Sequence, residues 1–309
     1  MDIKQLRAVS AVGAHRSFSG AARALSTVQS NISAHVARLE RELGVTLIER
    51  ETNELTPEGQ VVAARTQRIE TELEALASDL AALRDEVVGQ VRVGMIGTTA
   101  RWLVPLLLDH LSVAHPGIHV TLLDGTTSVL LPRVVEGDLD LAVVSESSHD
   151  PAVSMVSLFD EDLVLVVGVD HPLAGRSRVS VVDLDGWEVI LDVPGSRFRA
   201  LLDARCAAAG VELLPKAEIE GLRLIASLAF SGFGAAVLPA SAAPYGGSQD
   251  WVAIPFDDIA GRTVGLAQRR PGMPSAAART VAEAIVEVVT ASAAHQGGIR
   301  ARTSGAGAS

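Results

Sequence analysis

Hydrogen-bonding side chains are concentrated in one short stretch near the start of the chain. Residues 28–43 follow a helical pattern that is apolar along one stripe only, and Gln29, Ser30, Asn31 and Ser33 crowd its first turns. Glutamine and asparagine can each make a bidentate contact with adenine, and serine can reach a base or a phosphate. This pattern predicts a helix whose N-terminal end enters the major groove of DNA.

Further side chains around this helix suit contacts with bases or with the phosphate backbone. Ser17 and Thr27 are expected to cap two successive helices, while Arg38 suits a phosphate. Capping and ordinary surface polarity remain alternatives for Ser30 and Ser33 taken singly. The candidate DNA-binding residues are Ser17, Ser19, Thr27, Gln29, Ser30, Asn31, Ser33, His35, Arg38 and Arg50.

The distribution of charge agrees with a DNA-binding N-terminus. The whole chain has 26 basic and 37 acidic residues, which gives a formal net charge of −11. Residues 1–38 nevertheless hold five basic groups against one acid, a local charge of +4. Affinity for DNA depends on such a local basic face rather than on the net charge.

A second group of polar residues follows two strand-like segments later in the chain. Residues 97–101 read Gly-Thr-Thr-Ala-Arg, and residues 125–128 read Gly-Thr-Thr-Ser. Backbone N–H groups and hydroxyls at the start of a helix suit a carboxylate or another small anion, although helix capping alone also favours these residues. Two arginines and two phenylalanines would complete such a site. The candidate residues of this small-molecule site are Thr98, Thr99, Arg101, Thr126, Thr127, Ser128, Arg197, Phe198 and Phe230.

Motifs that would indicate catalysis are missing from the sequence. It contains neither a Gly-x-Ser-x-Gly nucleophile elbow nor a Walker-type phosphate loop, and no acid–base pair stands out. His110, His115 and His119 lie close in sequence, but no cysteine or carboxylate completes a plausible metal set. The single cysteine, Cys206, excludes a disulfide within one chain. We therefore expect no catalytic residue, no metal and no cofactor.

The N-terminal elements that would position the first group form a winged helix-turn-helix. Three helices are predicted over 3–14, 18–25 and 28–43, with Gly44 ending the third. Two short strands over 45–50 and 55–56 would then enclose a turn. We assign residues 1–56 to this DNA-binding domain.

A long helix is predicted to follow, over residues 57–88, with Thr56 as its cap and Pro57 at its first position. Apolar residues recur along it at alternating spacings of three and four, a heptad seam with one polar place at Thr66. The opposite face is strongly charged, which favours a dimerising linker helix over a helix packed on its own domain. The seam consists of Val62, Thr66, Ile69, Leu73, Leu76, Leu80, Leu83 and Val87.

The chain changes character after Gly89, where apolar strand-like runs alternate with helical stretches. Such alternation implies parallel sheets covered by helices, and about 200 residues leave room for two sheets. We assign residues 89–294 to an α/β domain with two subdomains. Residues 295–309 are rich in Gly, Ala, Ser and Arg and are expected to form a disordered tail.

The order and wording of these parts resemble the LysR-type transcriptional regulators. The similar segments include residues 18–25, 27–33, 38–44 and 55–59, together with looser matches at 137–142 and 171–174. The resemblance implies a fold with an all-α winged helix-turn-helix, a linker helix and a two-lobed effector domain like a periplasmic binding protein. It further implies double-stranded operator DNA and a small-molecule effector as partners, homodimers through the linker helix, and homotetramers as pairs of dimers.

One departure concerns the wing, which is shorter than usual and carries Glu51 and Glu54 where basic residues or glycine are common. Two acids make poor phosphate contacts, so little DNA affinity is expected from the wing.

The first residues lack the apolar core of a signal peptide, and no apolar run suffices for a membrane span, so we expect a cytoplasmic protein.

The leading interpretation is thus a sequence-specific transcriptional regulator whose DNA binding a small, anionic effector modulates, and not an enzyme. Two alternatives remain open from the residues alone. One is a small-molecule binding protein or enzyme built on the α/β part. The other is a DNA-binding regulator that responds to no ligand.

Overall fold

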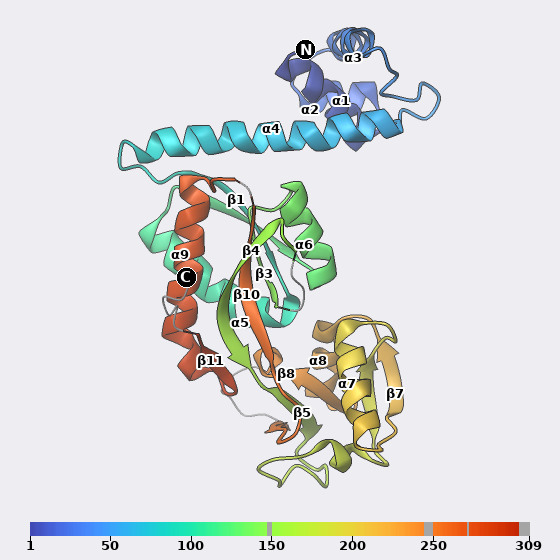
Figure 1. Ribbon diagram of the computed structural model, residues 1–309, viewed down its shortest axis with the longest axis vertical. Coiled ribbons are helices and arrows are strands. Elements are labelled where there is room, and N and C mark those ends of the chain that lie inside the picture. The colour runs from blue at the N-terminus through green and yellow to red at the C-terminus, as the bar shows by residue number, and fades with distance from the viewer. Residues whose placement is uncertain (147–149, 244–249, 271, 303–309) are drawn as a thin grey trace. The chain divides into compact units, whose positions relative to one another are not determined.

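The computed structural model describes residues 1–146, 150–243, 250–270 and 272–302. The chain divides into two compact units, and each is described separately. The first unit comprises Met1–Leu80 with the short segment Glu136–Asp138, and the second comprises the remainder. Figure 1 labels most of the helices and strands of both.

Three amphipathic helices build the core of the first unit. Their apolar stripes meet at buried side chains that include Leu6, Val12, Ile32, Val36 and Leu39. The helix-turn-helix predicted from the polar stretch is therefore present. The helices are α1 (Ile3–His15), α2 (Phe18–Ala24) and α3 (Gln29–Leu43).

Two local predictions for this unit differ from the structure. Ser17 caps α2 as expected, because its hydroxyl accepts the N–H of Gly20. Thr27 does not cap α3: Val28 occupies the N-cap position without a side-chain hydrogen bond. The wing strands reduce to one isolated antiparallel bridge between Ile48 and Leu55, because α4 begins at Pro57, two residues after Leu55, and leaves no room for a longer second strand.

Helix α4 (Pro57–Ala82) carries the heptad seam from Val62 to Leu80, but it ends six residues before the predicted Val88. Leu83 and Val87, the last two predicted seam residues, therefore lie outside the helix. Thr66 fits its apolar surroundings because its hydroxyl donates to the carbonyl of Val62 within the helix. The C-terminal part of the seam is exposed in the single chain, with Leu73 at 45% and Leu76 at 55%. This apolar stripe has the surface that a second copy of the helix would cover.

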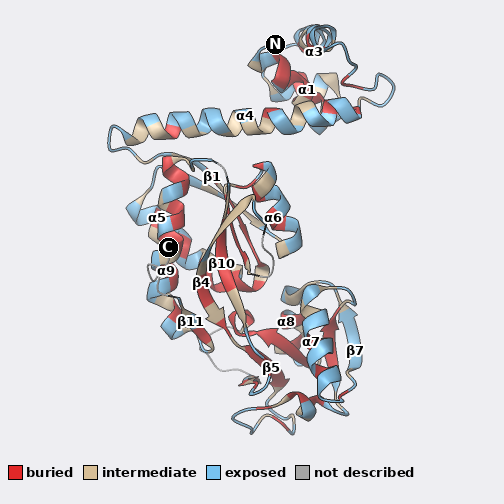
Figure 2. Cartoon of the chain, viewed as in Figure 1, coloured by how far each residue is buried: buried red, intermediate tan, exposed pale blue. Residues whose placement is uncertain are grey.

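The second unit contains two lobes, each built on its own sheet. Lobe 1 has a six-stranded sheet in the order β11-β4-β10-β3-β1-β2, and lobe 2 a five-stranded sheet in the order β7-β6-β8-β5-β9. The chain passes from lobe 1 to lobe 2 between β4 and β5 and returns between β9 and β10. The central strands are mostly buried in both sheets (Figure 2).

Helices cover the sheet of lobe 1. Helices α5 and α9 pack against each other along one side of it, and α6 lies on the other side in the view of Figure 1. The elements of lobe 1 are β1 (Gly89–Met95), α5 (Gly97–Ala114), β2 (Ile118–Asp124), α6 (Thr127–Glu136), β3 (Leu141–Ser145), β4 (Val153–Glu161), β10 (Arg262–Arg269), α9 (Ala276–Ser292) and β11 (Ile299–Ala301).

Lobe 2 has its own apolar core, centred on Leu165, Leu184, Leu191, Val237 and Ile254. Its cysteine, Cys206, belongs to that core. The elements of lobe 2 are β5 (Leu163–Gly168), β6 (Glu188–Asp192), α7 (Arg197–Ala208), β7 (Leu214–Ile219), α8 (Leu222–Phe230), β8 (Ala235–Pro239), the 3-10 turn η2 (Ala240–Ala242) and β9 (Trp251–Pro255).

Two expectations for the second unit were wrong. The sheets are mixed rather than parallel, because β4 and β5 run antiparallel to their neighbours β10, β8 and β9. The expected disordered tail is ordered as far as Arg302. Within it, β11 pairs with β4, and the guanidinium of Arg300 donates to both carboxylate oxygens of Asp162 at 2.9 and 2.6 Å. Residues 303–309 lie outside the described part.

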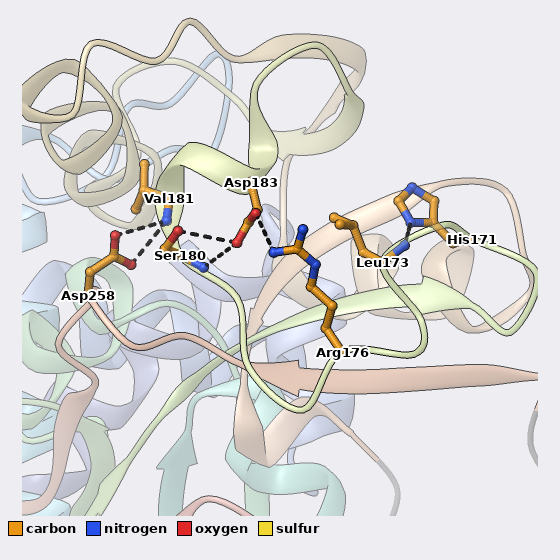
Figure 3. A network of polar contacts seen from close by, with 7 residues as sticks. All are labelled: His171, Leu173, Arg176, Ser180, Val181, Asp183 and Asp258. Carbon is orange, nitrogen blue, oxygen red and sulfur yellow. Dashed lines mark hydrogen bonds and ion pairs between the residues drawn. The ribbon is translucent and has the colours of Figure 1, made fainter.

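A polar network fixes the loop that follows β5 in lobe 2 (Figure 3). Asp183 accepts from the backbone N–H of Ser180 and from Arg176 at 2.9 and 2.6 Å. At the start of the loop, Nδ1 of His171 accepts the N–H of Leu173 at 3.2 Å, and the imidazole lies 4.5 Å from the ring of Trp187. An accepting Nδ1 requires the neutral imidazole with its proton on Nε2.

The His171 contact predicts that acid destabilises lobe 2. Burial lowers the pKa of His171 below its usual range, so the folded state favours the neutral ring. The corresponding stability is present above the unfolded pKa of about 6.5 and is lost as the pH falls through the folded value. Between pH 7.5 and about 5.5, the melting temperature of wild type should therefore fall more than that of His171→Gln. Parallel curves for the two proteins would contradict this role.

Candidate DNA-recognition surface and effector site

The start of α3 presents an exposed polar surface over a buried apolar one. Ile32, Val36 and Leu39 are at most 3% exposed and hold the helix against α1 and α2. The residues predicted to read bases point away from this core and are exposed, namely Gln29, Ser30, Asn31 and Ser33. A helix held in this way can present its first turns to a DNA groove without disturbing its own domain.

Neighbouring hydroxyls orient parts of this surface. The side-chain amide of Asn31 donates to the hydroxyl of Thr27 at 3.0 Å, and the hydroxyls of Ser17 and Ser19 lie 3.0 Å apart. Thr27 thus positions Asn31 instead of capping α3. The three basic candidates differ in exposure: Arg38 and Arg50 are exposed, and His35 is half-buried.

The two hydroxyl-bearing segments of lobe 1 converge as predicted. Strands β1 and β2 are parallel neighbours in register, with Met95 opposite Asp124, so the segments that follow them leave the sheet at the same edge. We call this place the α5–β2 edge and define it by residues 96–99 and 124–128. A hydrogen bond from the N–H of Ser145 to the hydroxyl of Thr127, 3.2 Å long, joins the end of β3 to it.

A buried polar network supports the first turn of α5. Oε1 of Glu161, which is fully buried, accepts Nε of Arg262 at 2.6 Å, and Oε2 accepts the N–H of Ser241 at 2.9 Å. Arg262 also donates to the hydroxyl of Thr98 at 2.9 Å. The hydroxyl of Thr98 is therefore not a simple helix cap. It accepts a hydrogen bond from Arg262, which begins β10 just after the chain returns from lobe 2 to lobe 1.

The other hydroxyls of the edge differ in their partners. Thr126 and Ser128 are exposed, and their hydroxyls lie 2.9 Å apart. Thr99 is fully buried, and its hydroxyl has no hydrogen-bond partner among the described residues. Such an unsatisfied buried hydroxyl is uncommon and is compatible with a partner that the single chain lacks.

The remaining candidates come from α5 and from lobe 2. The guanidinium of Arg101 lies 5.3 Å from the ring centre of Phe230, whose other neighbour is Trp251 at 4.5 Å. Arg197 is exposed in the first turn of α7. Phe198 instead packs against the core of lobe 2, where its ring has a structural role.

Four residues of this region escaped the sequence analysis. Arg262 and Glu161 are 101 residues apart and meet only through the pairing of β4 with β10. Arg223 and Asp124 form an ion pair between α8 and the end of β2. A local signal existed for Arg223 alone, because it follows a strand and a glycine at the start of a helix, the same pattern that singled out residues 97–101.

Taken together, a helix-turn-helix unit and a two-lobed α/β unit define a DNA-binding regulator with an effector-binding domain. The model of the bacterial regulatory helix-turn-helix proteins of the LysR family matches residues 3–60, and that of the LysR substrate-binding domain matches residues 84–290. The chain belongs to the LysR family of transcriptional regulators.

Individual relatives agree with this assignment. A probable hydrogen peroxide-inducible genes activator of Mycobacterium avium is 32% identical over 93% of this chain and 94% of its own length. A full-length structure of CbnR complexed with its target DNA has a TM-score of 0.70 at 25% identity, over 95% of this chain and 100% of that one.

A full-length structure of an OxyR variant from Pseudomonas aeruginosa has a TM-score of 0.71 at 24% identity, over 94% of each chain, which shows the fold. The relatives are transcriptional regulators and not enzymes, and this chain is a regulator as well.

Among the described residues, no helix is long and apolar enough to cross a membrane.

Proposed function

We propose that α3 reads operator DNA through its exposed N-terminal turns. Gln29 and Asn31 would contact base edges, Ser30 and Ser33 bases or phosphates, and Arg38 the backbone. The observation that carries this proposal is the polar first turn of α3 above a buried apolar stripe. The remaining contacts would come from Ser17, Ser19, Thr27, His35 and Arg50.

Substitution of Gln29 tests the base-reading role. Gln29→Ala should weaken binding to operator DNA by about 10- to 100-fold while leaving binding to scrambled DNA nearly unchanged. Titrations on both DNAs at one salt concentration measure this. Gln60→Ala, which removes an exposed amide from α4, is the matched control. Equal losses on operator and scrambled DNA would refute the role of Gln29.

We further propose homodimers through the exposed seam of α4 and tetramers formed from pairs of dimers. Two recognition helices on one dimer would bind half-sites about one DNA turn or a multiple of it apart. The domain boundaries that follow are residues 1–56 for DNA binding, 57–82 for the linker helix and 89–302 for effector binding. The protein would act in the cytoplasm, where its DNA partner lies.

The effector is proposed to be a small anion bound at the α5–β2 edge. Hydroxyls of Thr98, Thr99, Thr126, Thr127 and Ser128 gather around the first turn of α5, where backbone N–H groups and the helix dipole favour negative charge. Arg101 and Phe230 would border the site, as would Arg197. The packing of Phe198 against the core of lobe 2 leaves it a supporting role.

Sensing of hydrogen peroxide through a thiol is a second candidate, because relatives are named as peroxide-inducible activators. Peroxide attacks thiolates that solvent can reach. Cys206 is buried in the core of lobe 2, and burial, followed by the charges of Asp203 and Asp258, raises its pKa to about 11. Such a thiol is almost entirely protonated at neutral pH, so the structure favours a bound effector over thiol oxidation.

Hydrogen peroxide is therefore expected to leave the DNA affinity of wild type unchanged. Cys206 should remain reduced in the folded protein and become oxidised only after unfolding, which mass spectrometry measures. Cys206→Ala should bind operator DNA like wild type. A peroxide-induced change in DNA affinity that disappears in Cys206→Ala would establish the thiol mechanism instead.

A further inference from the structure

An arginine from lobe 2 lies over the start of α5 in lobe 1. Arg223, the second residue of α8, forms an ion pair with Asp124 at the end of β2. A β-carbon built on Gly97 would collide with Cδ of Arg223 and lie 2.8 Å from Oδ1 of Asp124. Glycine at the first position of α5 thus leaves room for this ion pair.

Two helix N-termini contribute positive potential to the same place. Helices α5 and α8 contact each other, and their N-cap residues, Ile96 and Gly221, provide no side-chain cap. The N–H of Gly221 donates to Oδ1 of Asp192 at 3.4 Å, so α8 has one carboxylate at its N-terminus. The dipole of α5 therefore adds to the charge of Arg223, and that of α8 adds the part that the carboxylate of Asp192 does not offset.

Buried polar groups in the first turn of α5 add a second, independent observation. The fully buried hydroxyl of Thr99 has no partner among the described residues. The hydroxyl of the preceding Thr98 is held by Arg262, a second guanidinium within reach of this turn. The first turn of α5 is thus prepared with hydrogen-bonding groups that the single chain does not use fully.

The ion pair between Arg223 and Asp124 is weak enough to be exchanged. Their side chains are 62% and 44% exposed. An exposed ion pair of this kind changes an equilibrium constant by at most about fivefold. An anion that enters the site can therefore take the place of the Asp124 carboxylate at little cost.

We propose that Arg223 determines the specificity of the site for an acidic effector, whose carboxylate replaces that of Asp124 between Arg223 and the first turn of α5. Asp124 then acts as an internal competitor that keeps Arg223 occupied in the absence of effector. This inference rests on the proposed anionic effector and adds the residue that recognises its charge. Because Arg223 belongs to lobe 2 and the first turn of α5 to lobe 1, the bound anion would bridge the lobes.

Acetate and acetamide test this proposal on the full chain, since they match in size and differ in charge. Affinities are measured by tryptophan fluorescence and by melting temperature, at an ionic strength held constant with sodium chloride. Wild type should prefer acetate over acetamide. Arg223→Gln should bind acetate at least about tenfold more weakly, and Asp124→Asn about two- to fivefold more tightly.

An exposed ion pair elsewhere in lobe 2, Arg178 with Asp257, supplies matched controls. Arg178→Gln and Asp257→Asn change the net charge in the same way and should bind acetate like wild type. Equal acetate affinity of Arg223→Gln and wild type, or weaker binding by Asp124→Asn, would overturn the role of Arg223 and leave the anion site standing. No preference of wild type for acetate would overturn the anionic effector itself.

Discussion

The Leu73→Asp variant is expected to be monomeric and to bind DNA with two half-sites at least about 100-fold more weakly than wild type. Leu73 lies in the exposed part of the α4 seam, between Ile69 and Leu76, which a second copy of the helix would cover. A carboxylate there would have to be buried without a partner, which opposes association. Since a single recognition helix binds weakly, loss of the dimer removes most of the affinity.

Sedimentation velocity and DNA titration measure the two parts of this prediction. Ala64→Asp is the matched control, because Ala64 is exposed and lies nine residues away, about half a turn around the helix from Leu73. It adds the same charge and should leave both association and affinity unchanged. A dimeric Leu73→Asp that binds DNA like wild type would show that α4 is not the dimer interface.

Glu161→Ala is expected to destabilise the effector-binding unit by about 2–4 kcal/mol. The substitution leaves the N–H of Ser241 without its acceptor and the guanidinium of Arg262 without its countercharge. The cost stays below that of a fully buried ion pair because the Arg262 side chain retains 19% exposure. Urea unfolding measures the change.

The partner residue provides the control for this prediction. If the loss arises from an unpaired charge, Glu161→Gln with Arg262→Gln should be more stable than Glu161→Ala, since no charge then remains buried. Without the carboxylate of Glu161, the guanidinium of Arg262 is no longer held beside Thr98. Glu161→Ala should therefore weaken the contact of Arg262 with Thr98 and alter effector affinity. A loss below about 1 kcal/mol in Glu161→Ala would contradict the network's structural role.

Local pattern sufficed to predict the helix-turn-helix and most of the effector domain. The apolar stripe ending in Leu39 lies within α3 itself, and the capping serine Ser17 directly precedes α2. Both features can therefore be recognised from a few neighbouring residues. The convergence of residues 97–99 and 125–128 was also predictable, since parallel neighbours end at one edge. The positions of individual hydroxyls there, and their roles, remain predictions.

What could not be predicted depends on contacts between distant residues. Strand β4 is only partly buried along its first half, and β11 has three residues in a segment rich in small side chains. Pairing with β4 and the ion pair of Arg300 with Asp162 order β11, and both partners lie over 130 residues away. The Glu161–Arg262 network and the Arg223–Asp124 pair were hidden for the same reason, since their partners lie 101 and 99 residues apart in the sequence.

The coupling between effector and DNA is the central claim, and one titration tests it most directly. Fluorescent operator DNA, selected from genomic fragments by the protein itself, is titrated with wild type in the presence and absence of the carboxylate metabolite that raises its melting temperature most. An effector that prefers one state of the protein should change operator affinity at least about fivefold, and its amide should not. Superimposable curves for the carboxylate, the amide and the free protein would contradict the account.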